Sequence, residues 1–130
     1  LCKFIRSKGE VYIGTPFCRE SKNRLELFKV PAFKIESGEC SNFPLIDYIA
    51  RKRKPVISST GMNNINIIEV AVNELKKHQI KHVLLHCTNL YPAPYKLVRL
   101  GVINLLKKNF QIRQSVFPII PKIIILLMLL

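Results

Sequence analysis

The sequence has little negative charge. Its 130 residues include eight Asp and Glu against 21 Lys and Arg, which gives a formal net charge of +13. Such an excess suggests an anionic partner: nucleic acid, acidic lipid or a phosphorylated small molecule. The basic residues are nevertheless spread in short groups at predicted helix ends, and no DNA- or RNA-binding signature is present. We therefore interpret most of them as solvated helix faces and predict no nucleic-acid partner.

Cysteine is also scarce, and its spacing excludes common uses. Cys2, Cys18, Cys40 and Cys87 form no C-x-x-C pair. This pattern argues against a zinc site and against a disulfide framework. We expect reduced thiols in a cytoplasmic protein, with Cys40 and Cys87 as small packing residues.

The sequence lacks a metal-binding histidine motif and a membrane-spanning run. His78, His82 and His86 are four residues apart, but residues 79–81 are predicted to separate a helix from a strand, so the three do not share a helical face. His86 remains a candidate to line a barrel. The apolar run Ile123–Leu130 is far shorter than the roughly 20 residues that a membrane span needs.

What is present is an alternation of strands and helices. We expect strands at 10–15, 30–37, 55–59 and 81–87. We expect helices at 19–28, at 42–53 with Asn42 as N-cap and Pro44 in the first turn, from a cap at Asn63 or Asn64 to before residue 79, and at 95–108. Alternating units predict an α/β fold with a parallel sheet, either doubly wound or a (β/α)8 barrel. No glycine-rich phosphate-binding motif follows any strand, which disfavours a nucleotide-binding sheet. The pattern alone leaves both architectures open, and four strands are only half of a barrel. The family resemblance given below implies a partial (β/α)8 TIM barrel of about four β/α units, over residues 1–114.

Polar residues stand at the end of every predicted strand, where barrel enzymes place their chemistry. These residues are Thr15, Ser37 with Glu39, Ser59 with Thr60, and Cys87, Thr88 and Asn89. Strand alternation places Lys34 opposite Phe33 and Ile35, and a lysine on the inner face is costly to bury without an anionic partner. Lys34 is thus a candidate ligand contact. The alternatives are a snorkelling surface lysine at Lys34 and simple strand-end caps at Thr15 and Ser59.

The segments that carry these residues resemble the N-acetylneuraminate (sialic acid) synthase family. The matching segments are Tyr12–Phe17, Lys34–Ile46, Pro55–Asn63, Leu85–Tyr95 and Val98–Gly101. The resemblance implies a cytoplasmic, homodimeric (β/α)8 barrel that condenses phosphoenolpyruvate with N-acetylmannosamine, or with its 6-phosphate in animal members. It also implies a divalent metal, manganese or magnesium, whose histidine ligands we expect outside these 130 residues.

The resemblance implies a phosphoenolpyruvate site at the strand ends. Lys34 would pair with the phosphoenolpyruvate anion, and the hydroxyls of Thr15, Ser37 and Ser59 would donate hydrogen bonds to its phosphate or carboxylate. Three hydroxyls and an ammonium around one anion fit preorganised electrostatic binding.

The same resemblance implies a sugar site beside it. Glu39 would accept hydrogen bonds from the sugar hydroxyls, and Asn89 and Tyr91 would complete the contacts near the reacting carbons. With Lys34, these three residues form the expected catalytic set.

The sequence departs from the family at two places. The family usually has a small residue at Glu36, which alternation places on the same face as Lys34, where it could pair with Lys34 or repel phosphoenolpyruvate. After Gln114, the hydrophobic tail 115–130 replaces an expected strand that ends in Ser-Asp-His-Thr. Codons for Phe117–Pro121 can encode that motif in another frame, so we hypothesise an out-of-frame tail, which the coding DNA tests. We expect such a tail to aggregate or to be poorly ordered.

These observations leave three functions open. The first is a sialic acid synthase fragment of the bacterial type. The second is a synthase of a related nonulosonic acid, such as legionaminic acid, or of a spore-coat polysaccharide sugar. The third is a non-catalytic basic remnant that binds anions or membrane surfaces. Because half a barrel leaves two open sheet edges, we expect the chain alone to be unstable and inactive.

Overall fold

The computed structural model describes residues 1–90 and 92–110 with their side chains. Beyond residue 110 it describes the backbone of four short strands within 114–116, 119–120, 123–124 and 126–129. The predicted division at residue 114 and the predicted frame change within 117–121 involve residues outside the fully described part.

A parallel sheet forms the centre of the molecule. Strands β1 (Phe33–Ile35), β2 (Val56–Ser59) and β3 (His82–His86) lie side by side in the order of the sequence. Lys34 is opposite Ile57, which is opposite Val83. All three strands therefore end at the same edge of the sheet, as the alternating sequence pattern predicts.

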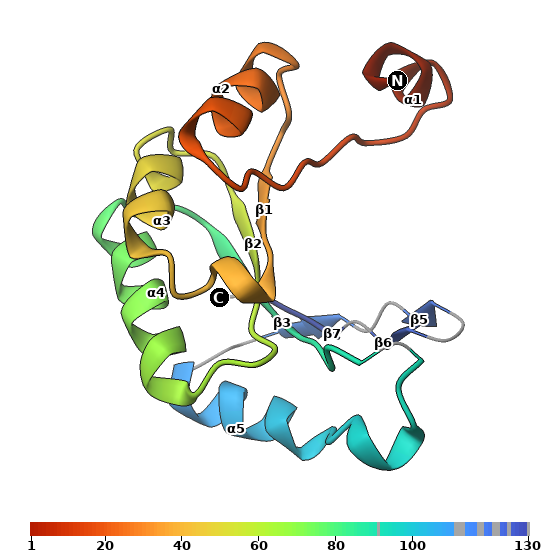
Figure 1. Cartoon of the computed structure of the whole chain (residues 1–130), viewed down its shortest axis with the longest axis vertical. Coiled ribbons are helices and arrows are strands. Elements are labelled where there is room, and N and C mark those ends of the chain that lie inside the picture. The colour runs from red at the N-terminus through yellow and green to blue at the C-terminus, as the bar shows by residue number, and fades with distance from the viewer. Residues whose placement is uncertain (91, 111–113, 117–118, 121–122, 125, 130) are drawn as a thin grey trace.

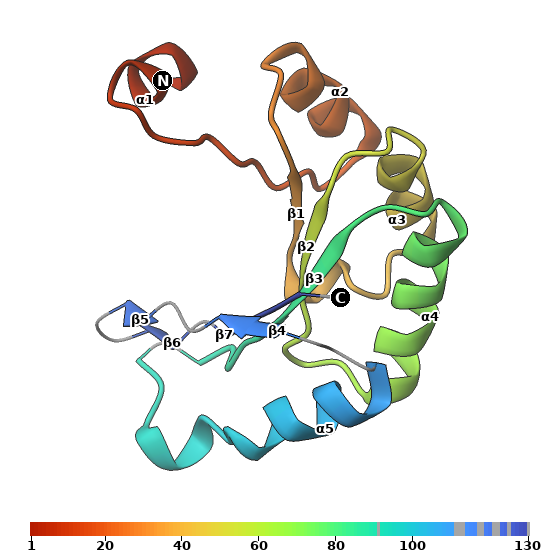
Figure 2. The same ribbon diagram turned by 180° about the vertical axis from the view of Figure 1, so that it is seen from behind.

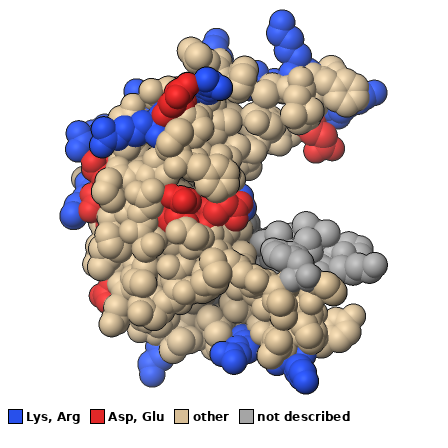
Figure 3. Space-filling view, viewed as in Figure 1, with Lys and Arg blue, Asp and Glu red and all other residues tan. Residues whose placement is uncertain are grey.

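Helices cover one side of this sheet. The helices are α1 (Cys2–Ser7), α2 (Arg19–Leu27), α3 (Phe43–Ala50), α4 (Ile65–Lys77) and α5 (Gly101–Phe110), with short 3-10 turns η1 (Ser37–Glu39) and η2 (Tyr95–Leu97). Figures 1 and 2 show α3, α4 and α5 in an arc around the outside of the strands, with α1 lying apart from the sheet. On the side away from these helices the molecule is hollowed (Figure 3). One-sided cover is typical of a barrel wall, whereas a doubly wound sheet has helices on both faces.

The two helices nearest the sheet begin at asparagine caps. The Asn42 side chain accepts a hydrogen bond from the backbone N–H of Leu45, and Pro44 occupies the first turn of α3. The Asn64 side chain accepts from the N–H of Ile67 at the start of α4. Each cap satisfies one of the N–H groups that the first helical turn leaves free. Asn42 and Pro44 take these places as predicted, and of the two asparagines proposed for α4, Asn64 is the cap.

The core lies between the strands and the helices. Phe33, Ile35 and Val56 are fully buried and face Ile46, Ile49, Val72 and Leu75 of the covering helices. Burial of apolar surface at about 25 cal/mol per Å² holds this layer together. Strand alternation then leaves Lys34 and its neighbours for the opposite, hollow side.

Two predicted elements are shorter than expected. The strand predicted at 10–15 is reduced to one parallel bridge between Gly14 and Phe33, because Val11 and Ile13 remain exposed with no strand beside them among the described residues. The helix predicted at 95–108 splits into η2 and α5. Arg99 has a positive φ of 50°, which ends the first turn before Gly101 starts the helix.

The tail changes one expected feature of the sheet. Strand β7 (Leu126–Leu129) pairs antiparallel with β3, and β4 (Gln114–Val116) pairs with β7, while β5 (Ile119–Ile120) and β6 (Ile123–Ile124) pair with each other. The expectation that half a barrel leaves the edge at β3 open is therefore wrong in this structure. Among the described helices, none is long and apolar enough to cross a membrane.

Candidate functional site

The ends of the parallel strands form one continuous polar region. The backbone N–H of Lys34 donates to Gly14 O at 3.0 Å, which brings Thr15 beside β1. The N–H of Thr60 donates to Leu85 O at 2.9 Å, which joins the ends of β2 and β3. Acidic side chains gather at this level of the molecule, beside η1 and the hollow (Figure 3).

Lys34 lies at the centre of this region and is ion-paired. Its ammonium contacts Glu36 Oε1, and the Thr15 hydroxyl lies 3.5 Å from the same oxygen. The Lys34 side chain is 29% exposed and that of Glu36 is 42% exposed. Lys34 therefore has the anionic partner that its position requires, and that partner is the residue at which the sequence departs from the family pattern.

Ser37 and Asn89 meet across the ends of β1 and β3. The Ser37 hydroxyl, which is almost fully buried, donates to Asn89 Oδ1 at 3.4 Å. A side chain at Gly61 could not fit here, because a Cβ would lie 2.8 Å from the carbonyl oxygen of Cys87 and would collide with Asn89. Gly61 thus permits the close approach of two predicted site residues.

Asn63 ties two of the loops together. Its side-chain amide donates to Ser37 O at 2.8 Å and to Gly61 O at 2.7 Å. These bonds fix the β1 end against the loop that follows β2. Sequence reasoning considered Asn63 only as a helix cap, because its role depends on a contact 26 residues away.

Ser59 presents a buried hydroxyl toward the same region. It is 1% exposed, and its Oγ has no hydrogen-bond partner among the described residues. Its neighbour is the Cys87 thiol, a poor hydrogen-bonding group whose pKa is raised by burial. A buried hydroxyl without a strong partner is costly, and a bound polar ligand would remove that cost.

The other predicted residues have separate surroundings. Glu39 is half-buried, and its Oε2 accepts from the Asn42 amide at 2.7 Å. Tyr91 lies outside the described residues. His86 donates from Nε2 to Val98 O at 2.7 Å and follows Leu84 on the helix-facing side, so the expectation that it lines the barrel is wrong.

A separate cavity of about 580 Å³ adjoins the ends of β2 and β3 on the helix-covered side of the sheet. It lies between the loops after β2 and β3 and the helices α4 and α5, and its polar lining includes Thr60, Asn63, Asn64, Thr88, Asn89 and Arg99. The strand ends therefore combine an ammonium with several hydroxyls and amides, a set of donors that suits a small polar anion.

The described strand ends do not fit a divalent metal. Within residues 1–90 and 92–110, the one group of three His, Cys, Asp or Glu side chains with ligating atoms close together is Asp47, Glu74 and His78. These residues belong to α3 and to the far end of α4. All four cysteines are free thiols.

Comparison with known proteins extends over most of the chain. Residues 1–115 match the family model described as the NeuB family. The N,N'-diacetyllegionaminic acid synthase of Campylobacter jejuni is 42% identical over 104 residues, which are 78% of this chain and 31% of that protein.

Two solved structures are similar in fold and sequence. The sialic acid synthetase of Leptospira borgpetersenii, in complex with citrate, has a TM-score of 0.77 and 32% identity, over 80% of this chain and 36% of that one. The spore coat polysaccharide biosynthesis protein spsE of Bacillus subtilis has a TM-score of 0.80 and 30% identity, over 84% and 31%. These neighbours have a TIM-barrel fold, of which this chain covers a part, as predicted. The chain spans about a third of the length of the proteins it matches.

Proposed function

Because this chain belongs to the NeuB family, we propose that its strand ends form part of a site for phosphoenolpyruvate and an N-acetylated amino sugar. The observation that carries the proposal is the convergence of Lys34, Thr15, Ser37 and Asn89 at one edge of the sheet. The sequence predicts each of these residues as part of the site, and they come from three separate segments of the chain.

Phosphoenolpyruvate binds through charge and hydrogen bonds in this proposal. The Lys34 ammonium faces the anion once Glu36 releases it, and Thr15 donates a hydrogen bond from the neighbouring strand end. The unpaired hydroxyl of Ser59 and the hydroxyl of Ser37 supply further donors. Donors held in place by the sheet lose little freedom on binding, which favours their use as an anion site.

The sugar binds beside the enol in this proposal. Glu39 accepts hydrogen bonds from its hydroxyls, while Asn89 and Tyr91 lie near the reacting carbons. The CH2 carbon (C3) of phosphoenolpyruvate forms a bond to the aldehyde carbon of the sugar, whose oxygen takes up a proton. Water adds to the neighbouring carbon C2 and loses its protons, and the C–O bond from C2 to phosphate breaks, so that C2 becomes the ketone carbon of the product. The first candidate for the aldose is N-acetylmannosamine, and the product is then N-acetylneuraminate. In this proposal the complete barrel acts as a cytoplasmic homodimer.

A related nonulosonic acid is the second candidate product. The similarity to a protein named N,N'-diacetyllegionaminic acid synthase favours it, since 104 aligned residues are 42% identical. The contacts to phosphoenolpyruvate are the same in both cases, and only the acyl sugar differs. Comparing the two aldoses in a binding assay in the presence of phosphoenolpyruvate distinguishes them.

Phosphoenolpyruvate binding by the 130-residue chain tests the proposal. Isothermal titration at fixed ionic strength should detect binding that Lys34→Ala weakens by at least about tenfold, because a charge-assisted bond contributes about 1.5–3 kcal/mol. Lys81→Ala is the matched control: Lys81 is exposed and precedes β3, at the opposite edge of the sheet. Lys81→Ala should leave the dissociation constant for phosphoenolpyruvate within about twofold of that of the unsubstituted chain. The reason is that solvent and salt screen an exposed charge that lies away from the site.

The same experiment separates this function from non-specific anion binding. A basic remnant that attracts anions by its net charge would lose equal affinity in both lysine variants, and it would bind anionic liposomes in a salt-sensitive way. Equal loss in Lys34→Ala and Lys81→Ala would therefore overturn the proposal of a specific site.

A further inference from the structure

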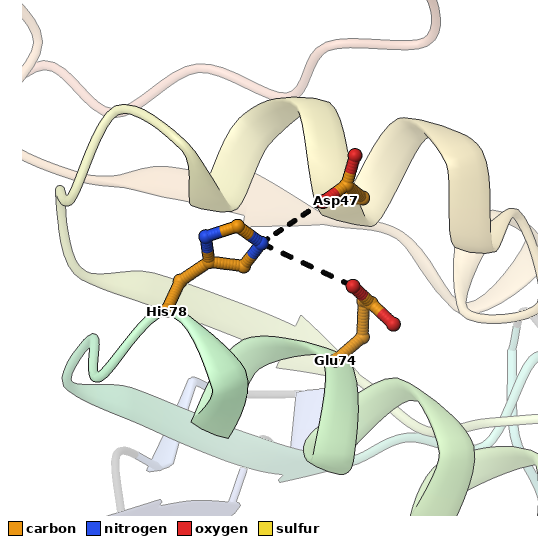
Figure 4. Close-up of side chains that lie close together, drawn as sticks. All are labelled: Asp47, Glu74 and His78. Atoms are coloured by element: carbon orange, nitrogen blue, oxygen red, sulfur yellow. Dashed lines mark hydrogen bonds and ion pairs between the residues drawn. The ribbon is translucent and has the colours of Figure 1, made fainter.

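A second group of ionisable side chains lies between α3 and α4. His78 follows the end of α4, Glu74 precedes it by one helical turn, and Asp47 projects from α3 (Figure 4). His78 Nε2 is 2.9 Å from Asp47 Oδ1 and 3.9 Å from Glu74 Oε1. One ligating atom from each residue lies within 4.8 Å of the other two.

We propose that Asp47, Glu74 and His78 bind a divalent transition-metal ion, and we take Zn²⁺ as the test ion. An imidazole nitrogen with two carboxylate oxygens is a donor set that Zn²⁺ accepts, and the imidazole disfavours Mg²⁺ and Ca²⁺, which take oxygen ligands. Water would complete a four-coordinate site. Neither the sequence spacing nor the family resemblance points to this group.

The neighbours of the carboxylates orient them for this role. Arg51 Nη2 is 2.7 Å from Asp47 Oδ2, and Lys77 Nζ is 2.7 Å from Glu74 Oε2. Each cation occupies the outer oxygen and leaves the inner oxygen directed toward His78. Such outer contacts orient metal ligands and tune their affinity.

The three side chains of the proposed metal site are partly buried, which distinguishes them from charges on the open surface. The side chains of Asp47, Glu74 and His78 are 29%, 17% and 25% exposed, respectively. Glu74 and His78 are four residues apart and so share a helix face, while Asp47 approaches from another helix. A bound ion would therefore join α3 to α4 and should stabilise the folded chain, because it binds a geometry that the unfolded chain lacks.

This site is distinct from the strand ends. The loop before α4 contains Gly61 and Asn63, which contact the strand-end residues, whereas His78 follows the last residue of the helix. A helix of 13 residues is about 20 Å long. An ion beside His78 would thus be remote from the proposed substrates, and the inference does not rest on the proposed function.

Metal binding can be followed at His78 itself. In its contact with Asp47, which can only accept, Nε2 carries the proton; a metal at Nε2 moves that proton to Nδ1. Titration of the untagged chain with ZnCl₂ should show this tautomer change for His78 in long-range ¹H–¹⁵N spectra, with one ion bound per chain by calorimetry. His82 and His86 serve as internal references and should keep their signals.

Variants on the same helix provide the matched comparison. His78→Gln and Glu74→Gln should each weaken Zn²⁺ binding by at least about tenfold, since even outer-shell partners are worth about 10–100-fold. Glu69→Gln removes the same charge from an exposed position of α4 and should change the affinity by less than about twofold. Circular dichroism of each variant verifies that the fold is retained.

Two results would overturn the inference. One is Zn²⁺ binding at equal affinity in His78→Gln and Glu69→Gln, which would place the ion at the exposed Cys18 thiol or elsewhere. The other is the absence of any change in the His78 signals at saturating ZnCl₂. This second reading uses the unsubstituted chain and remains decisive if a variant fails to fold.

Discussion

At the scale of single residues, Glu36 has the largest consequence for the strand-end site. Its carboxylate contacts the Lys34 ammonium and lies 3.5 Å from the Thr15 hydroxyl, the two groups proposed to bind the substrate anion. An internal carboxylate in this place competes with an external one for the same donors. Pairing, the first of the two outcomes considered from the sequence, is the one found in the structure.

Replacing Glu36 should therefore strengthen binding of phosphoenolpyruvate. We expect Glu36→Gly to lower the dissociation constant about two- to fivefold, because partly exposed ion pairs are worth up to about 1 kcal/mol. Glu20→Gly removes an exposed acid of α2 that pairs with Arg24 and contacts none of the proposed site residues, and it serves as a control for the change in net charge. Equal dissociation constants for Glu36→Gly and the unsubstituted chain, measured by calorimetric titration, would contradict the competition.

Cys18 should be the most reactive thiol of the chain. It is exposed, and the hydroxyl and backbone N–H of Ser21 lie 3.4 Å from its sulfur. These contacts lower the pKa of Cys18, whereas burial raises the pKa of Cys40 and of Cys87. Because the thiolate is the nucleophile, alkylation of Cys18 should begin at a lower pH than alkylation of the two buried thiols.

Mass spectrometry after iodoacetamide pulses at a series of pH values measures this order. Ser21→Ala should slow alkylation of Cys18 about two- to fivefold near neutral pH, as expected for the loss of one modest hydrogen bond. Cys2 is the internal reference and should react at an unchanged rate. Faster labelling of Cys40 than of Cys18 in the folded chain would disprove the assignment.

The sequence predicts some of the site residues but not others. Strand alternation is sufficient to place Lys34 and Glu36 on one face, and both lie there. The roles of Gly61 and Asn63 depend on Asn89 and Ser37, which are 26 or more residues away in the sequence. Such contacts require the packed structure. His78 likewise meets Asp47 only because α3 and α4 lie side by side.

At the scale of elements, α2 carries two ion pairs with the same spacing and opposite burial. Lys22 is fully buried, pairs with Glu26 Oε2 at 2.8 Å and lies 4.8 Å from the Tyr48 ring centroid. Arg24 and Glu20 form a similar pair, but both side chains are more than 70% exposed. The helix thus provides its own comparison between a desolvated charge and a solvated one.

Removing the partner of the buried lysine should destabilise the chain. Glu26→Gln leaves the Lys22 ammonium without its anion, and we expect a loss of about 1–3 kcal/mol in the free energy of unfolding. Glu20→Gln should have no measurable effect, since exposed pairs contribute little. Urea unfolding followed by circular dichroism measures both variants. Equal urea midpoints for Glu26→Gln and Glu20→Gln would contradict the predicted difference in stability.

The same pair makes stability depend on pH. The hydrogen bond from Lys22 lowers the pKa of Glu26 below its ordinary value of 4.5. The stabilisation from this pair is therefore complete above about pH 4.5 and is lost as the pH falls through the lowered value. In Glu26→Gln this part of the acid dependence should be absent from the unfolding midpoints.

Elements that depend on a few adjacent residues are predicted well from the sequence, whereas elements that depend on contacts with distant segments are not. Asparagine caps and apolar periodicity suffice for α3 and α4, because capping and amphipathicity are properties of a few adjacent residues. The segment 10–15 has strand-forming residues, but a strand needs a partner on its edge, and only Gly14 is paired. The helix predicted at 95–108 breaks at Arg99, which has a positive φ. Arginine, unlike glycine or asparagine, gives no indication of this backbone conformation in the sequence.

At the scale of the whole molecule, a one-sided sheet explains why a core forms although the strand-end site is incomplete. Helices bury the outer face of β1, β2 and β3, so a core forms without the rest of a barrel. The inner face and the strand ends face a hollow, and in a closed barrel the remaining strands would face them. Backbone pairing of β7 with β3 covers one edge with a strand of the opposite direction, which a parallel barrel does not contain.

We therefore expect no turnover from the 130-residue chain alone. Barrel enzymes assemble catalytic groups from the ends of several strands, and this chain supplies those of about four units, a third of the length of its relatives. Loss of orientation costs rate steeply, so weak phosphoenolpyruvate binding can persist while the reaction does not occur. Phosphate release from phosphoenolpyruvate and N-acetylmannosamine, with manganese present, measures this turnover. Phosphate release that depends on both substrates and disappears in Lys34→Ala would show that these few strand ends are a sufficient active site.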